Sequence, residues 1–433
     1  MPNKLKISQN PDISIIGGGM VGISLALLLS SYKLGWKIQI IDSRSLLAKS
    51  NNTLDNRFDR RTTALSQSSY EIYTALGLWE KLNVNASPIN EVHISDKGFF
   101  GNAKLTAQDQ NLPALGYILE NQTISDTLLD KAIKIDDIEI IDTAKINKIK
   151  PVSGAVELCY SKISEPDEIR NINTKLLIIA DGAESDTRNF LGIESTTKDY
   201  GQVAIVSNIT LSKDHNNVAY ERFTDSGPLA MLPLRKIEGY NRSALVWTVF
   251  SAQAQKLAAL TEAEFLNELQ LAFGFRLGKF TGASRRHSYP VRLTTSKEQV
   301  RSNIVIVGNA AHALHPVAGQ GFNLALRDIA ALADILAKSV TEEKVLGEYR
   351  VLENYIKHQK IDQNRTIFLS DFLPTVFGST SLLIRLARNI GLVALDSIPL
   401  LRRNFAKMGM GLHTKAPKIN IARTIDSTAS DSE

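Results

Sequence analysis

Cysteine is almost absent from this sequence. Its 433 residues include a single one, Cys159, which excludes an internal disulfide and any cysteine cluster that would hold zinc or an iron–sulfur centre. We expect no role for its thiol, because no partner residue is apparent. No metal site is predicted, and a reducing compartment is the expected environment of the chain.

Long apolar runs are missing as well. No stretch of about 18 or more uncharged apolar residues occurs, so the sequence predicts no membrane-spanning helix. Residues 1–11 contain Lys4 and Lys6 but no apolar centre, which is unlike a secretory signal. We therefore expect a cytoplasmic protein, with peripheral contact to the inner face of the membrane left open.

The sequence also lacks a strong net charge. Charged residues make up 22% of the chain and hydrophobic ones 43%, as in ordinary globular proteins with sizeable cores. The formal net charge of +5 is spread along the chain, so we expect no nucleic-acid partner. The same charge is compatible with an acidic membrane surface.

What the sequence does contain is a set of short apolar runs that read as buried strands. Residues 12–16 and 37–41 predict two parallel strands, joined by a helix over 20–32. Similar strands are predicted over 175–180 and 303–307. Stretches rich in β-structure lie between them, so a dinucleotide-type domain is interrupted by a second domain. The other predicted elements are a loop (43–63), helices (66–82, 122–133, 261–273, 322–339 and on to 411), a hairpin (91–112) and further strands (134–170, 200–250).

The first motif that carries chemistry is Gly17-Gly-Gly19-Met20-Val21-Gly22, which follows a strand and opens a helix. Gly17 allows the tight turn, Gly19 lets the backbone approach a pyrophosphate, and Gly22 lets helix and strand pack closely. Asp42 ends the second strand, where its carboxylate can accept hydrogen bonds from a ribose diol. The alternative is a glycine-rich turn without a ligand, and the motif alone does not separate FAD from NAD.

The second motif begins with Asp181 and Gly182, directly after a buried strand. Ser185 and Arg188 follow one helical turn apart. Asp181 lies where a strand ends beside a ligand cleft, but an Asp-Gly turn with a capping serine is the alternative for these residues.

The third motif runs from Gly308 to Asn323 and also follows a strand. Asn309 is placed to bond a ribityl hydroxyl, and the loop from Pro316 leads into a helix whose N-terminus suits the electron-rich edge of a reduced flavin. A glycine-rich connection without a ligand is the alternative. The candidate residues here are Gly308, Asn309, Pro316, Gly319, Gln320, Gly321 and Asn323.

The three motifs, in this order, resemble those of FAD-dependent aromatic hydroxylases with a single dinucleotide-binding domain. The resemblance covers nearly the whole chain and is sharper for the ubiquinone-biosynthesis branch of that family. Five further segments resemble this branch: 59–66 (DRRTTALS), 76–79 (LGLW), 93–98 (HISDKG), 114–117 (ALGY) and 318–324 (AGQGFNL). The Gly-Asn309 pair, where the family usually has Gly-Asp, is most similar to the 2-polyprenyl-6-methoxyphenol hydroxylases.

The resemblance implies bound FAD, with NAD(P)H as a transient reductant. It places Arg61 on the FAD, Asp181 at the pyrophosphate or ribose, and Asn309 at the ribityl chain. Asn121 stands where related hydroxylases have a Gln that contacts the flavin. Pro316, Gly319, Gln320 and Gly321 would line the isoalloxazine ring.

The implied reaction is hydroxylation of a polyprenylated phenol in ubiquinone biosynthesis, with O2 and a flavin hydroperoxide. No catalytic side chain is predicted, since this chemistry belongs to the cofactor. His312 and His315 are expected to be packed or capping residues, and Trp79 a core residue. Three alternatives stay open: a sister hydroxylase acting at another ring position, a prenyl reductase or oxidase on the same fold, and a non-catalytic scaffold in a biosynthetic complex.

The predicted fold is therefore α/β, with a Rossmann-like FAD domain interleaved with a β-sheet substrate domain. Apolar C-terminal segments, 368–384 and 390–401, alternate with arginines and predict either an apolar lid or membrane-facing surface, or helices that merely cover the core. The expected limits are 1–75, 115–190 and 300–345 for the FAD domain, 76–114 and 191–299 for the substrate domain, 346–412 for the C-terminal helices, and 413–433 for a disordered tail.

Overall fold

A computed structural model describes residues 10–47, 61–99, 101–316, 319–378 and 382–412 of the chain. Its first layer is a six-stranded sheet in the order β19-β20-β12-β1-β2-β8. All neighbours pair in parallel except β19, which is antiparallel to β20. The strands are β1 (Ile13–Ile16), β2 (Ile38–Ile41), β8 (Ile138–Ile141), β12 (Leu176–Ile179), β19 (Val300–Arg301) and β20 (Ile304–Ile306). Each comes from one of the three ranges expected for the FAD domain, whose exact limits stay a prediction.

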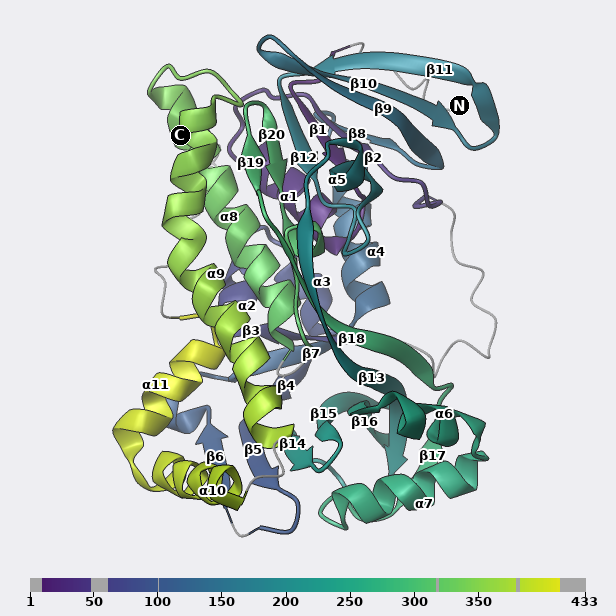
Figure 1. Ribbon diagram of the computed structural model, residues 1–433, viewed down its shortest axis with the longest axis vertical. Helices are drawn as coiled ribbons and strands as arrows, with labels where there is room; N and C mark the ends of the chain where they lie inside the picture. Colours follow the sequence, from purple (N-terminus) through teal and green to yellow (C-terminus); the bar gives the residue numbers. More distant parts are fainter. Residues whose placement is uncertain (1–9, 48–60, 100, 317–318, 379–381, 413–433) are drawn as a thin grey trace, which may run out of the picture.

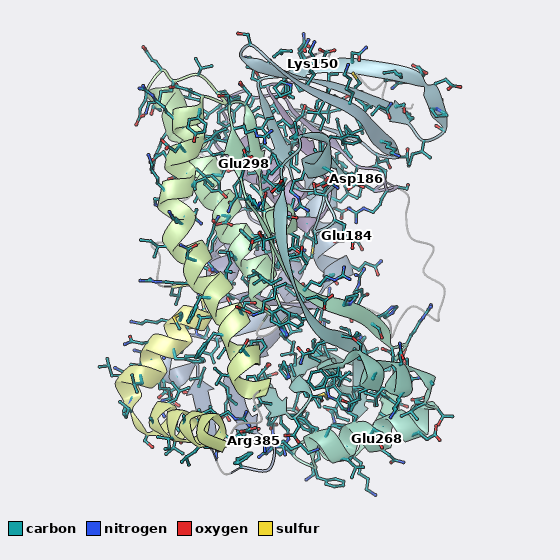
Figure 2. The ribbon with its side chains drawn as sticks, in the orientation of Figure 1. Lys150, Glu184, Asp186, Glu268, Glu298 and Arg385 are labelled. Atoms are coloured by element: carbon teal, nitrogen blue, oxygen red, sulfur yellow. The ribbon has the colours of Figure 1, made fainter. Side chains whose placement is uncertain are left out.

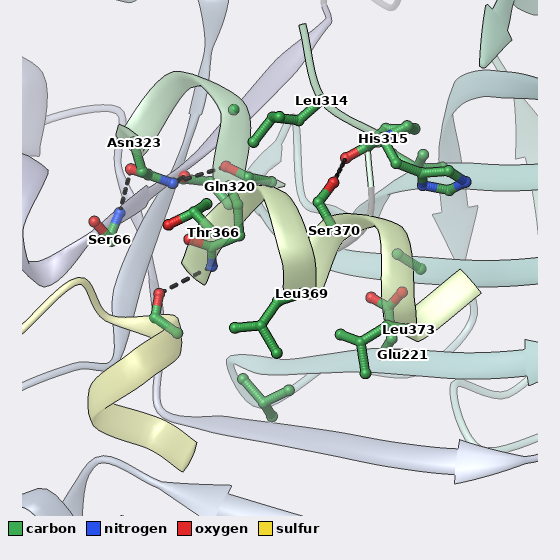
Figure 3. Close-up of a pocket in the computed structure, with 18 of the residues that line it drawn as sticks. Ser66, Glu221, Leu314, His315, Gln320, Asn323, Thr366, Leu369, Ser370 and Leu373 are labelled. Carbon is green, nitrogen blue, oxygen red and sulfur yellow. Dashed lines mark hydrogen bonds between the residues drawn. The ribbon is translucent and has the colours of Figure 1, made fainter. Parts of the chain in front are cut away.

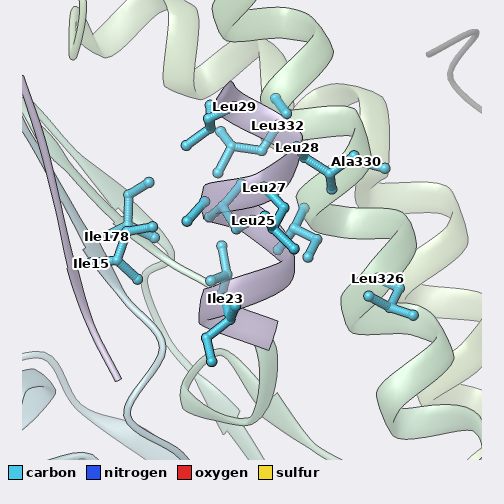
Figure 4. Packing of buried hydrophobic residues seen from close by; sticks show 14 of the residues in the cluster. Ile15, Ile23, Leu25, Leu27, Leu28, Leu29, Ile178, Leu326, Ala330 and Leu332 are labelled. Carbon is cyan, nitrogen blue, oxygen red and sulfur yellow. The ribbon is translucent and has the colours of Figure 1, made fainter. Parts of the chain in front are cut away.

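Helix α1 (Met20–Ser31) is the centre of the main core. It is apolar on every side, because it packs between the six-stranded sheet, α4 (Asn121–Ala132) and α8 (Gln320–Thr341). Figure 4 shows its leucines between Ile15 and Ile178 of the sheet on one side and Leu332 of α8 on the other. This packing fixes the N-terminus of α1 at the carboxyl edge of the strands, where the first glycine motif lies.

The helix predicted over 66–82 is wrong in detail. Strand β3 (Thr62–Ser66) precedes two shorter helices, α2 (Gln67–Ala75) and α3 (Trp79–Asn83). Gly77 separates them with a φ of +62°, a left-handed conformation that ends a helix and favours glycine. The predicted loop over 43–63 lies mostly outside the described residues. β3 and β4 (Ser87–Ile89) flank β7 (Gly116–Glu120) in a small antiparallel sheet.

A nine-stranded sheet forms the second layer, in the order β21-β18-β13-β16-β15-β14-β5-β6, with β17 paired to β13. The predicted hairpin over 91–112 is confirmed as β5 and β6. One face of the sheet is covered by α6 (Ser251–Ala259) and α7 (Glu262–Phe273), which pack on Ile205, Ile209 and Trp247. The strands are β5 (Glu91–Asp96), β6 (Asn102–Thr106), β13 (Ser195–Leu211), β14 (Val218–Thr224), β15 (Gly227–Ile237), β16 (Tyr240–Phe250), β17 (Phe280–Ala283), β18 (His287–Ser296) and β21 (His312–Ala313).

Helix α9 (Tyr349–Gly378) joins the two layers. Its 30 residues give a length of about 45 Å, and it packs beside α8, then against β19, and further on against β14 and β15. Figure 1 shows α8 and α9 side by side along the molecule, with α10 (Leu382–Ser397) and α11 (Pro399–Gly409) at the end near β5 and β6. A smaller antiparallel sheet of β9 (Ala144–Val152), β10 (Ala155–Lys162) and β11 (Glu165–Thr174) lies at the opposite end.

None of the helices in the described ranges combines the length and the apolar character that crossing a bilayer requires. The tail over 413–433, for which the sequence predicts disorder, lies outside the described residues.

Candidate functional site

The first glycine motif forms a tight turn between β1 and α1. A Cβ on Gly22 would overlap the carbonyl oxygen of Gly17, and a Cβ on Gly17 would overlap that of Ala180. Gly19 differs, because a Cβ there would meet nothing closer than Arg44 Nη2 at 3.8 Å. Gly17 and Gly22 thus permit close packing, while Gly19 leaves open the approach to the N-terminus of α1.

That N-terminus is suited to an anion. Gly19 is its N-cap residue, no side chain caps the helix, and no acidic residue lies in its first turn. The amide groups at this end therefore keep their hydrogen-bonding capacity, and the helix dipole adds positive potential. Met20 and Val21 are the first two residues of the helix, and Val21 packs against Gly308 of the third motif.

Asp42 lies where β2 ends, next to the glycine turn. Its Oδ2 atom accepts a hydrogen bond from the Gly18 amide at 2.7 Å and one from Arg44 Nη2 at 2.8 Å. Burial alone would raise the pKa of Asp42, but the hydrogen bonds from Arg44 and Gly18 outweigh it and hold the pKa below its ordinary value. A fixed carboxylate therefore stands beside the α1 N-terminus, as recognition of a ribose diol requires.

The second motif contributes one polar atom that the protein leaves without a partner. Asp181 Oδ2 accepts a hydrogen bond from the Thr187 amide at 3.2 Å, but Asp181 Oδ1 is buried and has no partner among the described residues. Gly182, with a φ of +101°, follows it in the turn. A buried carboxylate oxygen without a partner is costly, so this turn is shaped to receive a hydrogen-bond donor.

Arg188 points into the protein. Its Nη1 atom donates to the Ala310 carbonyl at 2.8 Å and its Nη2 atom to the Ala183 carbonyl at 3.2 Å, and its backbone amide is capped by Ser185. The side chain is 5% exposed. Arg188 therefore ties the second motif to the third, which suits a positioning residue.

The side chain of Asn323 likewise links separate segments of the chain through hydrogen bonds. Its Oδ1 atom accepts hydrogen bonds from the Ser66 amide at 2.8 Å and from Ser69 Oγ at 2.7 Å, as Figure 3 shows in part. Its Nδ2 atom donates to the Ala64 and Gly319 carbonyls, both at 2.8 Å. With every hydrogen-bonding position occupied, Asn323 fixes the start of α8 against β3 and α2.

A cavity of about 1550 Å³ opens beside the third motif. Asn309 and Pro316, both exposed, lie on its wall. The cavity exceeds the roughly 300–1,000 Å³ of ordinary ligand pockets, so it has room for more than one small molecule or for a long one. Eight of the candidate residues line it: Arg61, Asn121, Asn309, Pro316, Gly319, Gln320, Gly321 and Asn323.

The remaining candidates lie outside this cavity, at the carboxyl edge of the six-stranded sheet. The two groups meet where Val21 packs against Gly308. Together they form an elongated site, which suits a dinucleotide with a bulky end group. The residues of the second group are Gly17, Gly19, Met20, Val21, Gly22, Asp42, Asp181, Gly182, Arg188 and Gly308.

Two polar residues that directly flank strands of the small sheet line the cavity, Arg61 before β3 and Asn121 after β7. The Arg61 guanidinium lies over the Tyr289 ring, 5.7 Å from its centroid. Asn121 Oδ1 accepts a hydrogen bond from Thr63 Oγ1 at 2.6 Å, and the Asn121 amide donates to the Arg61 carbonyl at 2.8 Å. Backbone pairing between β3 and β7 thus holds both residues on the cavity wall.

The histidines of the third motif are packed, as the sequence predicts. His312 Nε2 lies 2.8 Å from Asp328 Oδ2 in a buried cluster that includes Gln359 and Gln363. His315 lies edge-on to Tyr200, and burial lowers the pKa of His315 to about 4, so its ring is neutral. Trp79, for which we expect a core position, packs between Tyr70 and Tyr117.

Sequence reasoning missed most of the cavity wall. One wall is the open face of the nine-stranded sheet, and another is formed by α9, α10 and α11. Figure 3 shows the part of this wall that α9 contributes, with Leu369 and Leu373. The most important omission is Glu221 on β14. Among the described residues that line the cavity it is one of two acidic ones, and the other, Asp362, is paired with Arg327. The sequence contains a pattern that could have revealed Glu221. Ala219, Glu221 and Phe223 alternate with more polar residues along the strand, so Glu221 is a charged residue on the side of the strand that is otherwise apolar.

Fold and site together define a FAD-dependent monooxygenase. A family model described as FAD binding domain matches residues 10–358, and the chain belongs to this family. It is 30% identical to the ubiquinone hydroxylase UbiL of Rhodospirillum rubrum, over 94% of this chain and 91% of that one. It is 28% identical to the 3-demethoxyubiquinol 3-hydroxylase of Escherichia coli, over 94% of this chain and all (100%) of the relative.

Solved structures show the same fold. The crystal structure of the p-nitrophenol 4-monooxygenase PnpA from Pseudomonas putida DLL-E4 superposes with a TM-score of 0.74 at 17% identity. The match covers 92% of this chain and 96% of that one. The uncapped α1 N-terminus, the lone Asp181 oxygen and the open surface at Gly19 all fit bound FAD, and NAD(P)H is the reductant typical of the family.

Proposed function

We propose that this monooxygenase hydroxylates the ring of a polyprenylated phenol in ubiquinone biosynthesis. The observation that carries the proposal is the cavity, which runs from Pro316 and Gln320 to Phe405 and Met408 of α11 between mainly apolar walls. A phenol ring fits beside the loop, and a prenyl chain fits along the apolar length. The names of the two hydroxylase relatives support the same pathway.

FAD is proposed to occupy the elongated site. Its ADP half would lie on the glycine turn with its ribose at Asp42, its ribityl chain at Asn309, and its ring beside Arg61 and the loop from Pro316 to Gly321. FAD supplies the redox chemistry: reduced by NAD(P)H, it activates O2 so that one oxygen atom enters the phenol ring and the other leaves as water.

The protein's own residues position the reactants and exclude water. The N-terminus of α8 has Gly319 as its N-cap residue and no capping side chain, so its amides and dipole face the loop. Asn323 and Arg188 hold this loop and the second motif in place through the hydrogen bonds described above. The apolar sheet face keeps water away from the ring that is oxidised.

The ring position is proposed from the third motif. Its Gly-Asn pair, with the Pro316–Asn323 loop, resembles the 2-polyprenyl-6-methoxyphenol hydroxylases, so we expect the hydroxyl to enter at the position those enzymes modify. Hydroxylation at another ring position of the same pathway is the competing outcome.

We propose in addition that α10 and α11 contact an anionic membrane surface. Leu386, Ile390, Leu400 and Leu401 are 46–68% exposed there. Arg403 and Lys407 are exposed on α11, close to the cavity wall that this helix forms. Apolar side chains next to basic ones are the pattern of a helix that lies in a membrane interface, from which a prenyl chain could enter the cavity.

The direct test uses the purified holoprotein, NAD(P)H, O2 and a phenol with a short prenyl chain. We expect NAD(P)H and O2 to be consumed in equal amounts, dependent on the phenol, with a product heavier by one oxygen atom in mass spectrometry. NAD(P)H consumption without O2 uptake would indicate a reductase. A deletion strain that accumulates no quinone precursor would contradict the pathway.

A further inference from the structure

Glu221 is an acidic residue on an otherwise apolar part of the cavity wall. Strand β14 pairs in parallel with β5 and antiparallel with β15, so the cross-strand neighbours of Glu221 are Ile94 and Ala230. On the same strand, Ala219 and Phe223 point to the same side. All of these residues line the cavity, and none of the neighbours can hydrogen-bond through its side chain.

The residues on either side of Glu221 point away from it, toward α7. Tyr220 lies edge-on to Phe273, 5.5 Å between ring centroids, and Arg222 Nε donates to the Ala272 carbonyl at 3.1 Å. Because side chains alternate along a strand, Glu221 faces the opposite side, into the cavity. Figure 3 draws it with Leu369, Ser370 and Leu373 of α9, which line the same space.

No charge in the cavity neutralises Glu221. Three of the other ionisable residues that line it are already paired: Arg292 with Asp199, Asp362 with Arg327, and Arg388 with Asp96. Arg61 lies over Tyr289, and Arg365 is exposed on α9. Burial is the cause that raises the pKa of Glu221, to about 7, and no charged neighbour contributes.

Glu221 is half-buried against apolar side chains and has no partner among the described residues. Such a carboxylate is costly unless a ligand supplies the missing donor. We propose that Glu221 accepts the hydrogen bond of the substrate's phenolic hydroxyl and takes its proton during hydroxylation. This inference rests on the proposed function, since it assigns the group that binds the polar end of the phenol. The cross-strand and same-strand neighbours of Glu221 on that face are apolar, so Glu221 also orients the ring.

The proton moves directly from the phenol to the Glu221 carboxylate, so no further reactant is needed. The phenol O–H bond breaks and leaves its electron pair on oxygen, while a new O–H bond forms on the Glu221 carboxylate. The resulting phenolate is more electron-rich than the phenol and attacks an electrophilic oxygen more readily. Once the ring carbon carries the new oxygen, it releases its own hydrogen to solvent as a proton. Glu221 then returns its proton to the former phenolate oxygen, which restores the aromatic ring.

The burial of Glu221 favours this role. A phenol has a pKa of about 10, so a base whose pKa is about 7 lies roughly three units below it, while an ordinary glutamate lies more than five units below. A base closer in pKa to its proton donor transfers the proton at a lower barrier. Because this pKa lies near neutrality, the carboxylate form that accepts the proton is available at and above neutral pH.

The test compares wild-type holoenzyme with E221Q, which keeps the shape of the side chain, and with E268Q as the matched control. Glu268 is exposed on α7, outside the cavity wall (Figure 2). Binding is measured without NAD(P)H, using a phenol with one prenyl unit and its methyl ether, which lacks the proton. Wild type and E268Q should prefer the phenol by about tenfold or more above pH 7, and less below it.

E221Q should lose this preference and its pH dependence while still binding the ether as the wild type does. In turnover, the rise of kcat/KM through pH 7 should disappear in E221Q, with a loss of about a hundredfold at pH 8. An unchanged preference and pH profile in E221Q, or a wild type without any preference for the phenol, overturns the inference. A wild type that shows the preference but forms no hydroxylated product contradicts the proposed function alone.

Discussion

At the scale of single residues, two properties define the site: whether a glycine leaves room for a Cβ atom, and whether a carboxylate oxygen has a hydrogen-bond partner. Gly22 has no room for a Cβ, whereas Gly19 has room in the protein but faces the region proposed for the pyrophosphate. Asp181 and Glu221 each keep a carboxylate that the described residues do not fully satisfy. Such residues are conspicuous because folded proteins pair nearly all buried polar groups.

The two glycines should respond differently to substitution. Gly22→Ala should destabilise the protein by about 3 kcal/mol, because its methyl group would overlap the Gly17 carbonyl. Gly19→Ala should cost less than about 1 kcal/mol, and Gly19→Glu should fold but abolish FAD binding by filling and repelling the pyrophosphate. Urea unfolding and the flavin absorbance of the purified variants measure both effects. Full flavin absorbance in Gly19→Glu would refute the placement of the cofactor.

Glu221 should also shape the pH dependence of stability. Its folded pKa of about 7 exceeds the ordinary 4.5, so between these values the folded state holds a proton that the unfolded state has released. The contribution of Glu221 to the free energy of unfolding therefore falls as pH rises through this window and is constant above it. E221Q lacks this fall and should be more stable than wild type by up to about 3 kcal/mol above pH 7, with no difference near pH 4. Equal stability at all pH values, by urea unfolding, would mean that Glu221 is solvated.

At the scale of elements, the C-terminal helices do two things at once. They form part of the cavity wall, and a buried ion pair between Arg388 of α10 and Asp96 of β5, at 2.6 Å, fixes α10 to the sheet. Their exposed side chains form the apolar and basic surface proposed to meet a membrane. Deleting them would remove both features, so substitutions on the exposed side are the more informative test.

Replacing both Ile390 of α10 and Leu400 of α11 by Glu should weaken binding to liposomes of anionic phospholipid by about tenfold or more, because two exposed apolar anchors outside the cavity wall become negative charges. Leu271→Glu is the matched control, since Leu271 is 73% exposed on α7. Cosedimentation measures the bound fraction, and added salt should reduce it for the wild type. Equal binding of the double variant and the control would exclude α10 and α11 as the contact surface.

At the scale of the whole molecule, the proposed FAD site draws on segments that are far apart in the sequence. The glycine turn, β3, the second motif and the start of α8 meet only when the six-stranded sheet and the small sheet are both formed. Helix α9 then connects this layer to the nine-stranded sheet (Figure 1). A ligand bound to such a site stabilises the entire fold, since binding requires all of these segments together.

Removing FAD should therefore lower the stability of the whole protein. Adding FAD back at about 100 times its Kd should raise the free energy of unfolding by about 2.7 kcal/mol, in proportion to the logarithm of its concentration. Thermal unfolding of the stripped protein against FAD concentration measures this effect. Gly19→Glu serves as the control and should show no response. A wild-type melting temperature independent of FAD would contradict the proposed cofactor site.

The sequence by itself determined the parallel strands, the glycine turn with Asp42, and the family resemblance, because these depend on local patterns: short apolar runs, glycine spacing and helix starts. It also led us to expect the packed roles of Trp79 and His312. It failed at residues 66–82, where Gly77 ends a helix that the periodicity continues. Only the tertiary structure decided that Arg188 and Asn323 hold loops together and that Glu221 faces an apolar cavity without a partner. Contacts between distant segments set the surroundings of a side chain, and those surroundings determine whether a carboxylate is solvated, paired or available to a substrate.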